Sequence, residues 1–372
     1  GVLPTASGTA APPSPRSMSL ICLGLNPALQ RRVALDALEV GSVNRAKESS
    51  VGIGGKGQGA FLSALRLARD AGAPPPRLVM LLGSGPEGDQ VAQLLTAQAG
   101  CGEDDALWQR VAAPLRVCTT LVESATGSAT EIVEPSGAVT AAEWEALVAA
   151  VGSEVARTGP ARGCVVSGTT PPGVPPDGYR RLLAAACGAE TKVLIDSVVG
   201  VGSTLEAVAR AGSSAVVKLN ARELLSLAGV KGPTGSESAV AADPTATAAA
   251  AAEWAKAQPA GSVKAICWTD GPFPGGVLDL KSRRRWRIER PELGFPVLSP
   301  IGAGDATAGA TLHYWCAKED PAADAALVAA EAFAFGMAVG SASCLTASNA
   351  DFNMDDVRRI HAAMQVIELE PL

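Results

Sequence analysis

Residues 300–309 read PIGAGDATAG, a glycine-rich turn that leads directly into a helical segment. This order places the backbone N–H groups of Ala303, Gly304 and Asp305 at the N-terminus of a helix. Free N–H groups and the helix dipole together bind anions at such a position. Asp305 then has two interpretations. It caps the helix, or it accepts a proton from a hydroxyl group that attacks a bound phosphate.

The chain around this turn alternates strands with helices from Leu20 onward. Helical patterns cover 57–72 and begin again at Asp305 and Asp324. Short apolar runs typical of buried strands lie at 20–25, 77–83, 164–168, 192–196, 214–220 and 263–269. This alternation predicts an α/β fold, in which helices cover both faces of a mainly parallel sheet.

Two segments, at about 29–50 and 110–135, depart from this alternation. Both are richer in the period-2 pattern, as in LRVCTTLVES at 115–124, which is typical of strands with one buried face. We expect them to form a small separate sheet, a lid, with one face over a pocket or a partner subunit. Residues 231–245 have the composition of a surface insertion.

Composition excludes several classes of protein. The 372 residues carry 31 basic and 37 acidic side chains, a net charge of −6, and 47% of them are apolar. A disordered chain is therefore excluded. The acidic balance makes nucleic acid an unexpected partner, and the basic run 281–287 is interpreted as a solvated strand or turn. No membrane partner is expected, because no uninterrupted apolar run reaches about 18 residues.

The eight cysteines and the N-terminal segment indicate in which cellular compartment the protein is expected. The cysteines are scattered without a CxxC pair, which favours free thiols in a reducing compartment, the chloroplast stroma or the cytoplasm. Residues 1–18 are rich in Ala, Pro, Ser and Gly and predict a disordered leader. This leader is either the remnant of a transit peptide or a cloning scar, and the globular domain is expected over 19–372.

Three further motifs each have a functional and a structural interpretation. In VGIGGKGQGA (51–60), Lys56 could reach a hydroxyl or phosphate beside glycines that let a ligand approach, or the motif is a plain turn before a helix. In KLNARE (218–223), Asn220 and Glu223 could hold a hydrated Mg²⁺, or form a capping box. TDGPFPGG (269–276) suits nucleotide phosphates or an ordinary hairpin turn.

Together these segments resemble the ribokinase-like (PfkB) carbohydrate kinase family over nearly the whole chain from Leu20. The GAGD signature is the most specific of them. The motifs occur in the family's order: NPA (26–28), GGKG (54–57), SGTTPPGVPPDGY (167–179), KLNARE (218–223), TDG (269–271) and GAGD (302–305). The third motif, with EIVEPSGAVT (131–140), is most similar to the branch containing 1-phosphofructokinase and tagatose-6-phosphate kinase.

The resemblance implies a Rossmann-like α/β domain with a β-sheet lid that transfers the γ-phosphoryl of ATP, with Mg²⁺, to a hydroxyl of a sugar or sugar phosphate. It implies Asp305 as the base. The other implied residues are Gly302, Ala303 and Gly304 in the anion hole, Lys218, Asn220, Thr269 and Gly271 along ATP, and Asn220 and Glu223 on Mg²⁺ through water. A monovalent cation and a homodimer formed through the lid are further expectations.

The sequence differs from the family's motifs at positions where the family binds the sugar. Gln30 replaces the family's Asp after NPA-x, Gly59 replaces the Asn of GGKG-x-N, and DSVVG at 196–200 replaces DTSG. A lost carboxylate removes charge-assisted hydrogen bonds of about 1.5–3 kcal/mol. The other expected substrate residues are Gly54, Gly55 and, for gripping a phosphate, Arg45, Lys56 and Arg116, each of which has an ordinary ion pair as its alternative.

These departures keep a second function open. A non-catalytic, fructokinase-like scaffold subunit of a plastid assembly would tolerate altered sugar-binding residues. The intact GAGD turn and the Asn220-x-x-Glu223 spacing favour an enzyme instead.

Overall fold

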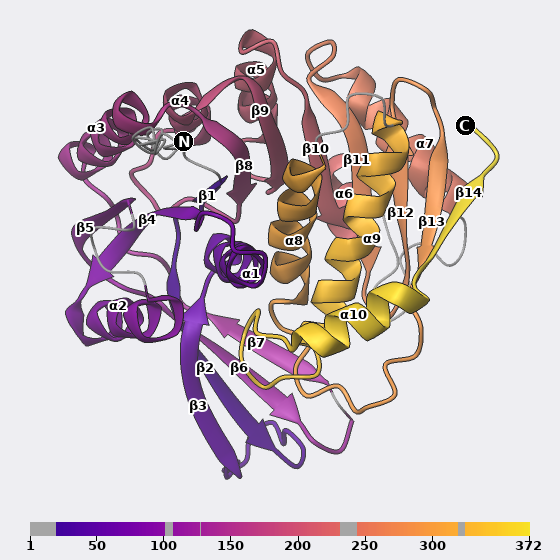
Figure 1. Cartoon of the computed structure of the whole chain (residues 1–372). Helices are drawn as coiled ribbons and strands as arrows, with labels where there is room; N and C mark the ends of the chain where they lie inside the picture. Colours follow the sequence, from indigo (N-terminus) through magenta and orange to yellow (C-terminus); the bar gives the residue numbers. More distant parts are fainter. Residues whose placement is uncertain (1–19, 101–106, 127, 231–243, 319–323) are drawn as a thin grey trace, which may run out of the picture.

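The computed structural model describes residues 20–100, 107–126, 128–230, 244–318 and 324–372. The expected leader at 1–18 and nearly all of the expected insertion at 231–245 lie outside these ranges. Within the described residues, a ten-stranded sheet runs through the body of the molecule, and a four-stranded sheet projects from one end of it (Figure 1).

The central sheet confirms the mainly parallel α/β arrangement. Seven neighbouring strands are parallel among the described residues, as expected for strands joined by crossover connections that place helices on the faces of the sheet. They are, in spatial order, β5 (Leu107–Pro114), β4 (Arg77–Ser84), β1 (Leu20–Leu23), β8 (Ala161–Ser167), β9 (Cys187–Asp196), β10 (Ala215–Asn220) and β11 (Val263–Asp270). The sheet continues through antiparallel β12 (Phe273–Asp279), β13 (Arg285–Glu289) and β14 (Gln365–Leu369).

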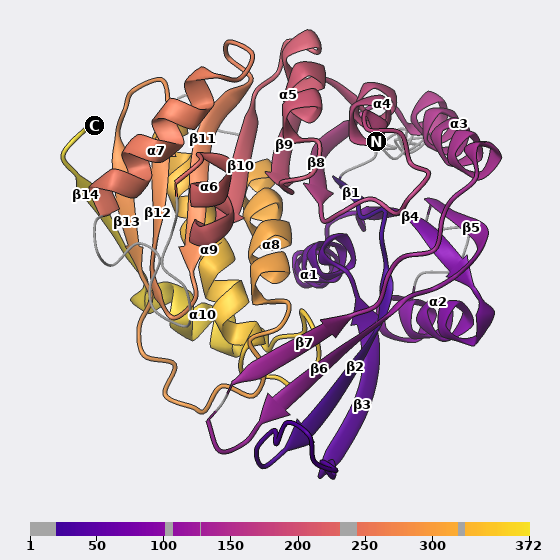
Figure 2. The same ribbon diagram turned by 180° about the vertical axis from the view of Figure 1, so that it is seen from behind.

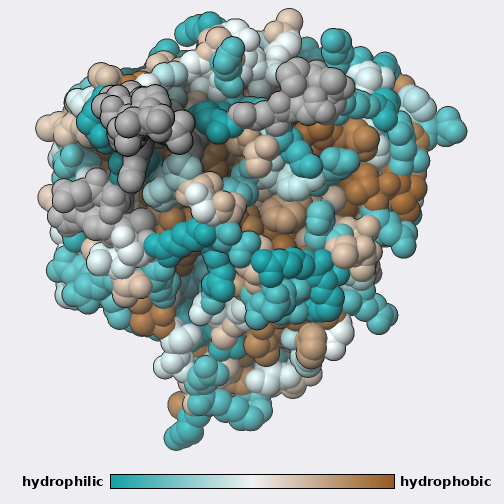
Figure 3. All heavy atoms as spheres, in the orientation of Figure 1, coloured by the Kyte–Doolittle hydropathy of each residue, from teal (hydrophilic) through white to brown (hydrophobic). Residues whose placement is uncertain are grey.

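Helices cover both faces of this sheet. One face packs against α1 (Lys56–Asp70), α2 (Gly85–Ala99), α8 (Ala303–Ala317) and α9 (Ala325–Ser343), with α10 (Met354–Ala363) outside α9 (Figure 1). The other packs against α3 (Ala141–Thr158), α4 (Gly178–Ala186), α5 (Val201–Arg210), α6 (Ala221–Leu227) and α7 (Pro244–Lys256) (Figure 2). The surface on the first side is mainly hydrophilic, with separate apolar patches (Figure 3).

Helix α9 is, within the described part of the chain, long and apolar enough to cross a membrane. Its most apolar window has a mean hydropathy of 1.6, and 67% of that window is buried inside the protein. It packs against α8 and α10, which is the environment of a core helix.

The small sheet is the expected lid, with corrected boundaries. Its strands are, in order, β3 (Glu48–Gly54), β2 (Ala28–Leu35), β6 (Val117–Glu123) and β7 (Ala129–Val133). The second segment therefore begins at Val117 instead of 110, because β5 pairs with β4 in the central sheet. An edge strand of a large sheet also has one exposed face, so its period-2 pattern does not distinguish it from a lid strand.

Candidate active site

A hollow of about 410 Å³ lies between the lid and the carboxyl ends of the parallel strands. Register puts Gln30, Cys118 and Val133 opposite one another, on one face of the lid, and this face lines the hollow. The body of the molecule contributes side chains from several elements. They are Lys56 and Gln58 from α1, Ser167 at the end of β8, Ser197 just after β9, Glu223 from α6, Gly302 and Asp305 from the GAGD turn, and Asn349 from the loop after α9.

The turn before α8 presents free amides to this hollow. Gly302 is the N-cap with a positive φ of 81°, a conformation that glycine adopts readily. The first bond within the helix runs from the Ala306 N–H to the Gly302 carbonyl at 2.8 Å, so the N–H groups of Gly304 and Asp305 precede it. Asp305 is thus inside the first turn and is not the cap. This geometry suits an anion.

Asp305 is held in an unusual environment for a carboxyl group. A Cβ on Gly59 would lie 2.7 Å from the Asp305 Cβ, so helix α1 approaches α8 here only because residue 59 has no side chain. Burial is the largest cause that raises the pKa of Asp305, and Asp196 adds to it, while Lys56 and Lys218 oppose the rise, so that the pKa lies at about 7. A carboxyl group with such a pKa can exchange a proton near neutral pH.

Two lysines lie beside this carboxyl group. Lys56 Nζ donates to Glu223 Oε1 at 2.8 Å. Burial lowers the pKa of Lys56, but Asp196 and Glu223 more than compensate, so the ammonium form is favoured. Lys218 is only 3% exposed, and its Nζ donates to the Gly304 carbonyl at 2.8 Å. The Lys218 amine therefore lies beneath the anion-binding turn.

Asn220 and Glu223 form the capping box that the sequence offered as an alternative. The Glu223 N–H donates to Asn220 Oδ1 at 2.8 Å, and the Asn220 N–H donates to Glu223 Oε2 at 3.1 Å. Within the described residues, no group of three or more His, Cys, Asp and Glu side chains could hold a metal ion. A Mg²⁺ bound mostly by water and substrate phosphates needs only one or two carboxylates, so the capping box does not exclude it.

Several polar side chains of the hollow were not identified from the sequence. Gln58 Oε1, Ser167 Oγ and Asn349 Oδ1 are buried and have no hydrogen-bond partner. An unpaired buried polar atom costs about 1–3 kcal/mol, so this hollow is suited to a ligand that carries several hydroxyl groups. Gln58 and Ser167 lie inside motifs that the sequence already marked, whereas nothing in the sequence around Asn349 indicates a site.

Some of the expected substrate residues line the hollow, and others do not. Gln30 faces the hollow, where its Nε2 donates to Thr120 Oγ1 at 2.8 Å. Gly55 and Arg116 also line the hollow, and Arg116 Nη2 donates to the Asn26 carbonyl at 2.9 Å.

The lining of the hollow does not include eight of the expected site residues, which are Arg45, Gly54, Lys218, Asn220, Thr269, Gly271, Ala303 and Gly304. Arg45 lies in an exposed loop of the lid, so the structure does not place it for gripping a phosphate in this hollow. Gly54 packs against Gln30 from the neighbouring strand, while Thr269 and Gly271 lie at the end of β11.

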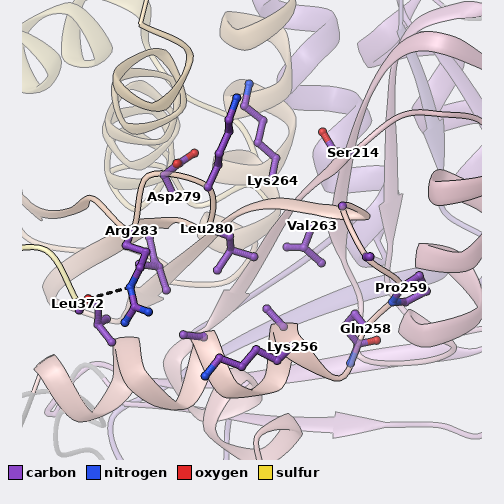
Figure 4. Close-up of a pocket in the computed structure, with 16 residues that line it drawn as sticks. Ser214, Lys256, Gln258, Pro259, Val263, Lys264, Asp279, Leu280, Arg283 and Leu372 are labelled. Carbon is purple, nitrogen blue, oxygen red and sulfur yellow. Dashed lines mark hydrogen bonds between the residues drawn. The ribbon is translucent and has the colours of Figure 1, made fainter.

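A larger hollow, of about 640 Å³, lies beside α7 at the opposite edge of the sheet (Figure 4). Val263 and Leu280 form part of its wall, and Lys264 points away from α7. Because its polar groups do not converge, the smaller hollow is the better candidate active site.

Solved structures share this architecture. Phosphofructokinase-2 from Escherichia coli in complex with potassium has a TM-score of 0.71 at 21% identity, over 93% of this chain and 98% of that one. Ribokinase from Giardia lamblia has a TM-score of 0.69 at 15% identity, over 92% and 99% of the two chains. These likenesses establish a ribokinase-like α/β fold.

The sequence places the chain more narrowly. Residues 28–355 match the model of the pfkB family carbohydrate kinases, and the chain belongs to this family. It is also 30% identical to the 1-phosphofructokinase of Xanthomonas campestris pv. campestris over 211 residues, which are 56% of this chain and 61% of that protein. The match thus spans about three fifths of the relative's length.

Proposed function

We propose that the protein is an ATP-dependent kinase that transfers the γ-phosphoryl group of ATP to a hydroxyl of a sugar or sugar phosphate, with phosphofructokinase-like substrates. The observation that carries this proposal is the half-buried Asp305 carboxyl group, which lies beside the free amides of the GAGD turn in a hollow lined by unpaired polar atoms. Membership of the pfkB family supports it.

In this mechanism Asp305 accepts the proton of the attacking hydroxyl group. The free amides of Gly304 and Asp305 stabilise the charge on the transferring phosphoryl group. Of the other residues expected in the anion hole, Gly302 provides the turn, and the Ala303 N–H donates to the Pro300 carbonyl at 3.4 Å. Gln30, Gly55 and the neighbouring amide side chains orient the sugar. Arg116 and Lys56 are the cations that line the hollow and could meet a phosphate on the substrate.

ATP and Mg²⁺ would bind beside the hollow, at the carboxyl ends of β10 and β11. Asn220 and Glu223 would hold Mg²⁺ through water molecules, and the ion would neutralise charge on the phosphates. Thr269 and Gly271, at the end of β11, would contact ATP. Lys218 would act through the Gly304 carbonyl, to which it is bonded.

A monovalent cation fits the loop after α9. The Thr346 Oγ1 lies 3.0–3.1 Å from the carbonyl oxygens of Ser343, Ser348 and Asp351. A hydroxyl donates only one hydrogen, and the Ser343 carbonyl also accepts from the Thr346 N–H at 3.2 Å, so at least one of the Ser348 and Asp351 carbonyls has no donor from Thr346. Carbonyl clusters bind potassium. Activity should therefore rise when potassium chloride replaces tetramethylammonium chloride.

The decisive experiment is a panel of ketoses and their phosphates with MgATP. We expect ADP formation with at least one phosphorylated ketose, and ³¹P NMR should show the new phosphoester. If the protein bound nucleotide but formed no ADP with any acceptor, the kinase function would be contradicted. The result would favour the second function, a non-catalytic scaffold subunit. The replacement of the family's sugar-binding residues by Gln30 and Gly59 supports that second function.

A further inference from the structure

Asp196, the last residue of β9, lies between the two lysines of the site. It is 1% exposed. Its Oδ2 is 3.4 Å from Lys218 Nζ, and its Oδ1 is 3.9 Å from Lys56 Nζ. Oδ1 is buried and makes no hydrogen bond. The Asp196 carboxylate therefore lies near both ammonium groups. Its contact with Lys56, whose closer partner is Glu223, is electrostatic.

The two lysines lead to different parts of the site. Lys218 Nζ holds the Gly304 carbonyl in the anion-binding turn at 2.8 Å. Lys56 Nζ holds Glu223 Oε1, on the side assigned to Mg²⁺, also at 2.8 Å. Strand β9 and helices α1 and α6 are thus joined to the turn before α8 through a single carboxylate.

We propose that Asp196 is a positioning residue for phosphoryl transfer, which keeps the anion-binding turn and the Glu223 carboxylate in register with each other. The inference rests on the proposed kinase function. Without the carboxylate, the two ammonium groups would repel each other and the buried Lys218 would lose its counter-ion. A buried charge without a partner is strongly unfavourable, so the lysines and the groups they hold would shift.

A pH readout separates this role from a merely structural one. The charged groups that face Asp305 are Asp196 from β9, Lys56 from α1, Lys218 from β10 and Glu223 from α6. Asp196 raises the pKa of Asp305, so its neutral replacement should lower that pKa. The acidic limb of the profile of kcat against pH, where the rate falls because the base becomes protonated, would then move to lower pH.

The test is Asp196→Asn, with kcat and KM measured against pH. Small displacements of catalytic groups can cost about 10²-fold, so we expect kcat to fall by roughly that factor. KM for ATP and for the sugar should change by less than about threefold, since Asp196 does not touch either. The acidic limb should move to lower pH.

Asp279→Asn is the matched control. Asp279 is 4% exposed and accepts hydrogen bonds from Ser282 at the opposite edge of the sheet. We expect Asp279→Asn to affect stability without moving the acidic limb. If both variants gave the same kcat and the same limb as the wild type, the positioning role would be overturned.

A second variant covers a failure of Asp196→Asn to fold. Lys218→Met keeps much of the apolar stem but removes the bond to Gly304, and it should likewise lower kcat more than either KM. A folded Lys218→Met with wild-type kcat would overturn the proposal. Wild-type enzyme without activity on any acceptor would overturn the kinase function itself, whereas active wild type with unaffected variants overturns only the role of Asp196.

Discussion

Asp305, the proposed base, has a carboxyl group whose pKa is raised, chiefly by burial. Asp305→Asn keeps the size of the side chain but cannot accept a proton. General-base catalysis contributes about 10²–10⁴-fold, so kcat should fall by that factor with little change in ATP affinity. Steady-state kinetics and nucleotide titration would measure both. A variant that keeps more than about a third of the wild-type kcat would remove Asp305 from the role of base.

The same substitution should stabilise the protein in a pH-dependent way. The pKa of Asp305 is raised from 3.8 to about 7 in the fold, so between these values the folded state binds the proton more tightly than the unfolded state. Wild-type stability therefore falls as pH rises through this window. Asp305→Asn has no such loss, and its advantage in Tm should be small near pH 4 and largest above pH 7. Thermal unfolding across this range would measure it, and an advantage independent of pH would contradict the shift.

Gln30 is the residue that should determine which sugar binds. It lies on the lid face that lines the hollow, where the family has a carboxylate. Gln30→Asp should change the ranking of substrates, because a carboxylate forms charge-assisted hydrogen bonds with hydroxyl pairs, while ATP affinity stays nearly constant. The substrate panel would measure the ranking. Equal changes in kcat/KM for every acceptor would mean that Gln30 does not read the sugar.

At the scale of elements, one side chain joins the lid to the loop after α9. Asn349 Nδ2 donates to the carbonyl of Ile53 in β3 at 3.0 Å, and its Oδ1 is an unpaired acceptor at the hollow. Loss of one neutral hydrogen bond costs about 0.5–1.5 kcal/mol. We expect Asn349→Ala to raise the sugar KM by about threefold to tenfold and to leave the ATP KM nearly unchanged.

The exposed neighbour Ser348→Ala is the control for this prediction, because its side chain is outside the hollow. Initial rates over a range of sugar concentrations would measure the effect. If both variants had the wild-type sugar KM, Asn349 would have no part in binding the sugar.

At the scale of the whole molecule, the lid has a second face that points away from the hollow. Val51 and Ile132 lie on that face and are 42% and 55% exposed. Exposed apolar side chains on a small sheet favour an interface, and we propose that this face joins two copies of the chain. Ile132→Lys should shift the dimer to monomer in light scattering, whereas Glu39→Lys, in the exposed loop, should not. A wild-type monomer at high concentration would contradict the interface.

The sequence alone determined the class of the fold and the GAGD turn, because both depend on local properties. Apolar runs and helical periodicity predicted strands that the structure has at β1, β4, β8, β9, β10 and β11. Glycine followed by a helical pattern likewise predicted the free amides of Gly304 and Asp305 at the start of α8, since chain direction fixes where a helix exposes N–H groups. The third expected amide, that of Ala303, donates to the Pro300 carbonyl instead.

Tertiary structure decided what the polar residues contact. The sequence could not exclude 110–114 from the lid, because strand periodicity reports exposure and does not identify the partner strand. Lys56 meets Glu223 across 167 residues of sequence. Asp196 reaches both lysines, and Asn349 reaches the lid, only because parallel strands and long crossovers bring their ends to one edge of the sheet. The distances between these side chains depend on how the strands and helices pack. No short stretch of the sequence encodes them, because the residues are far apart along the chain.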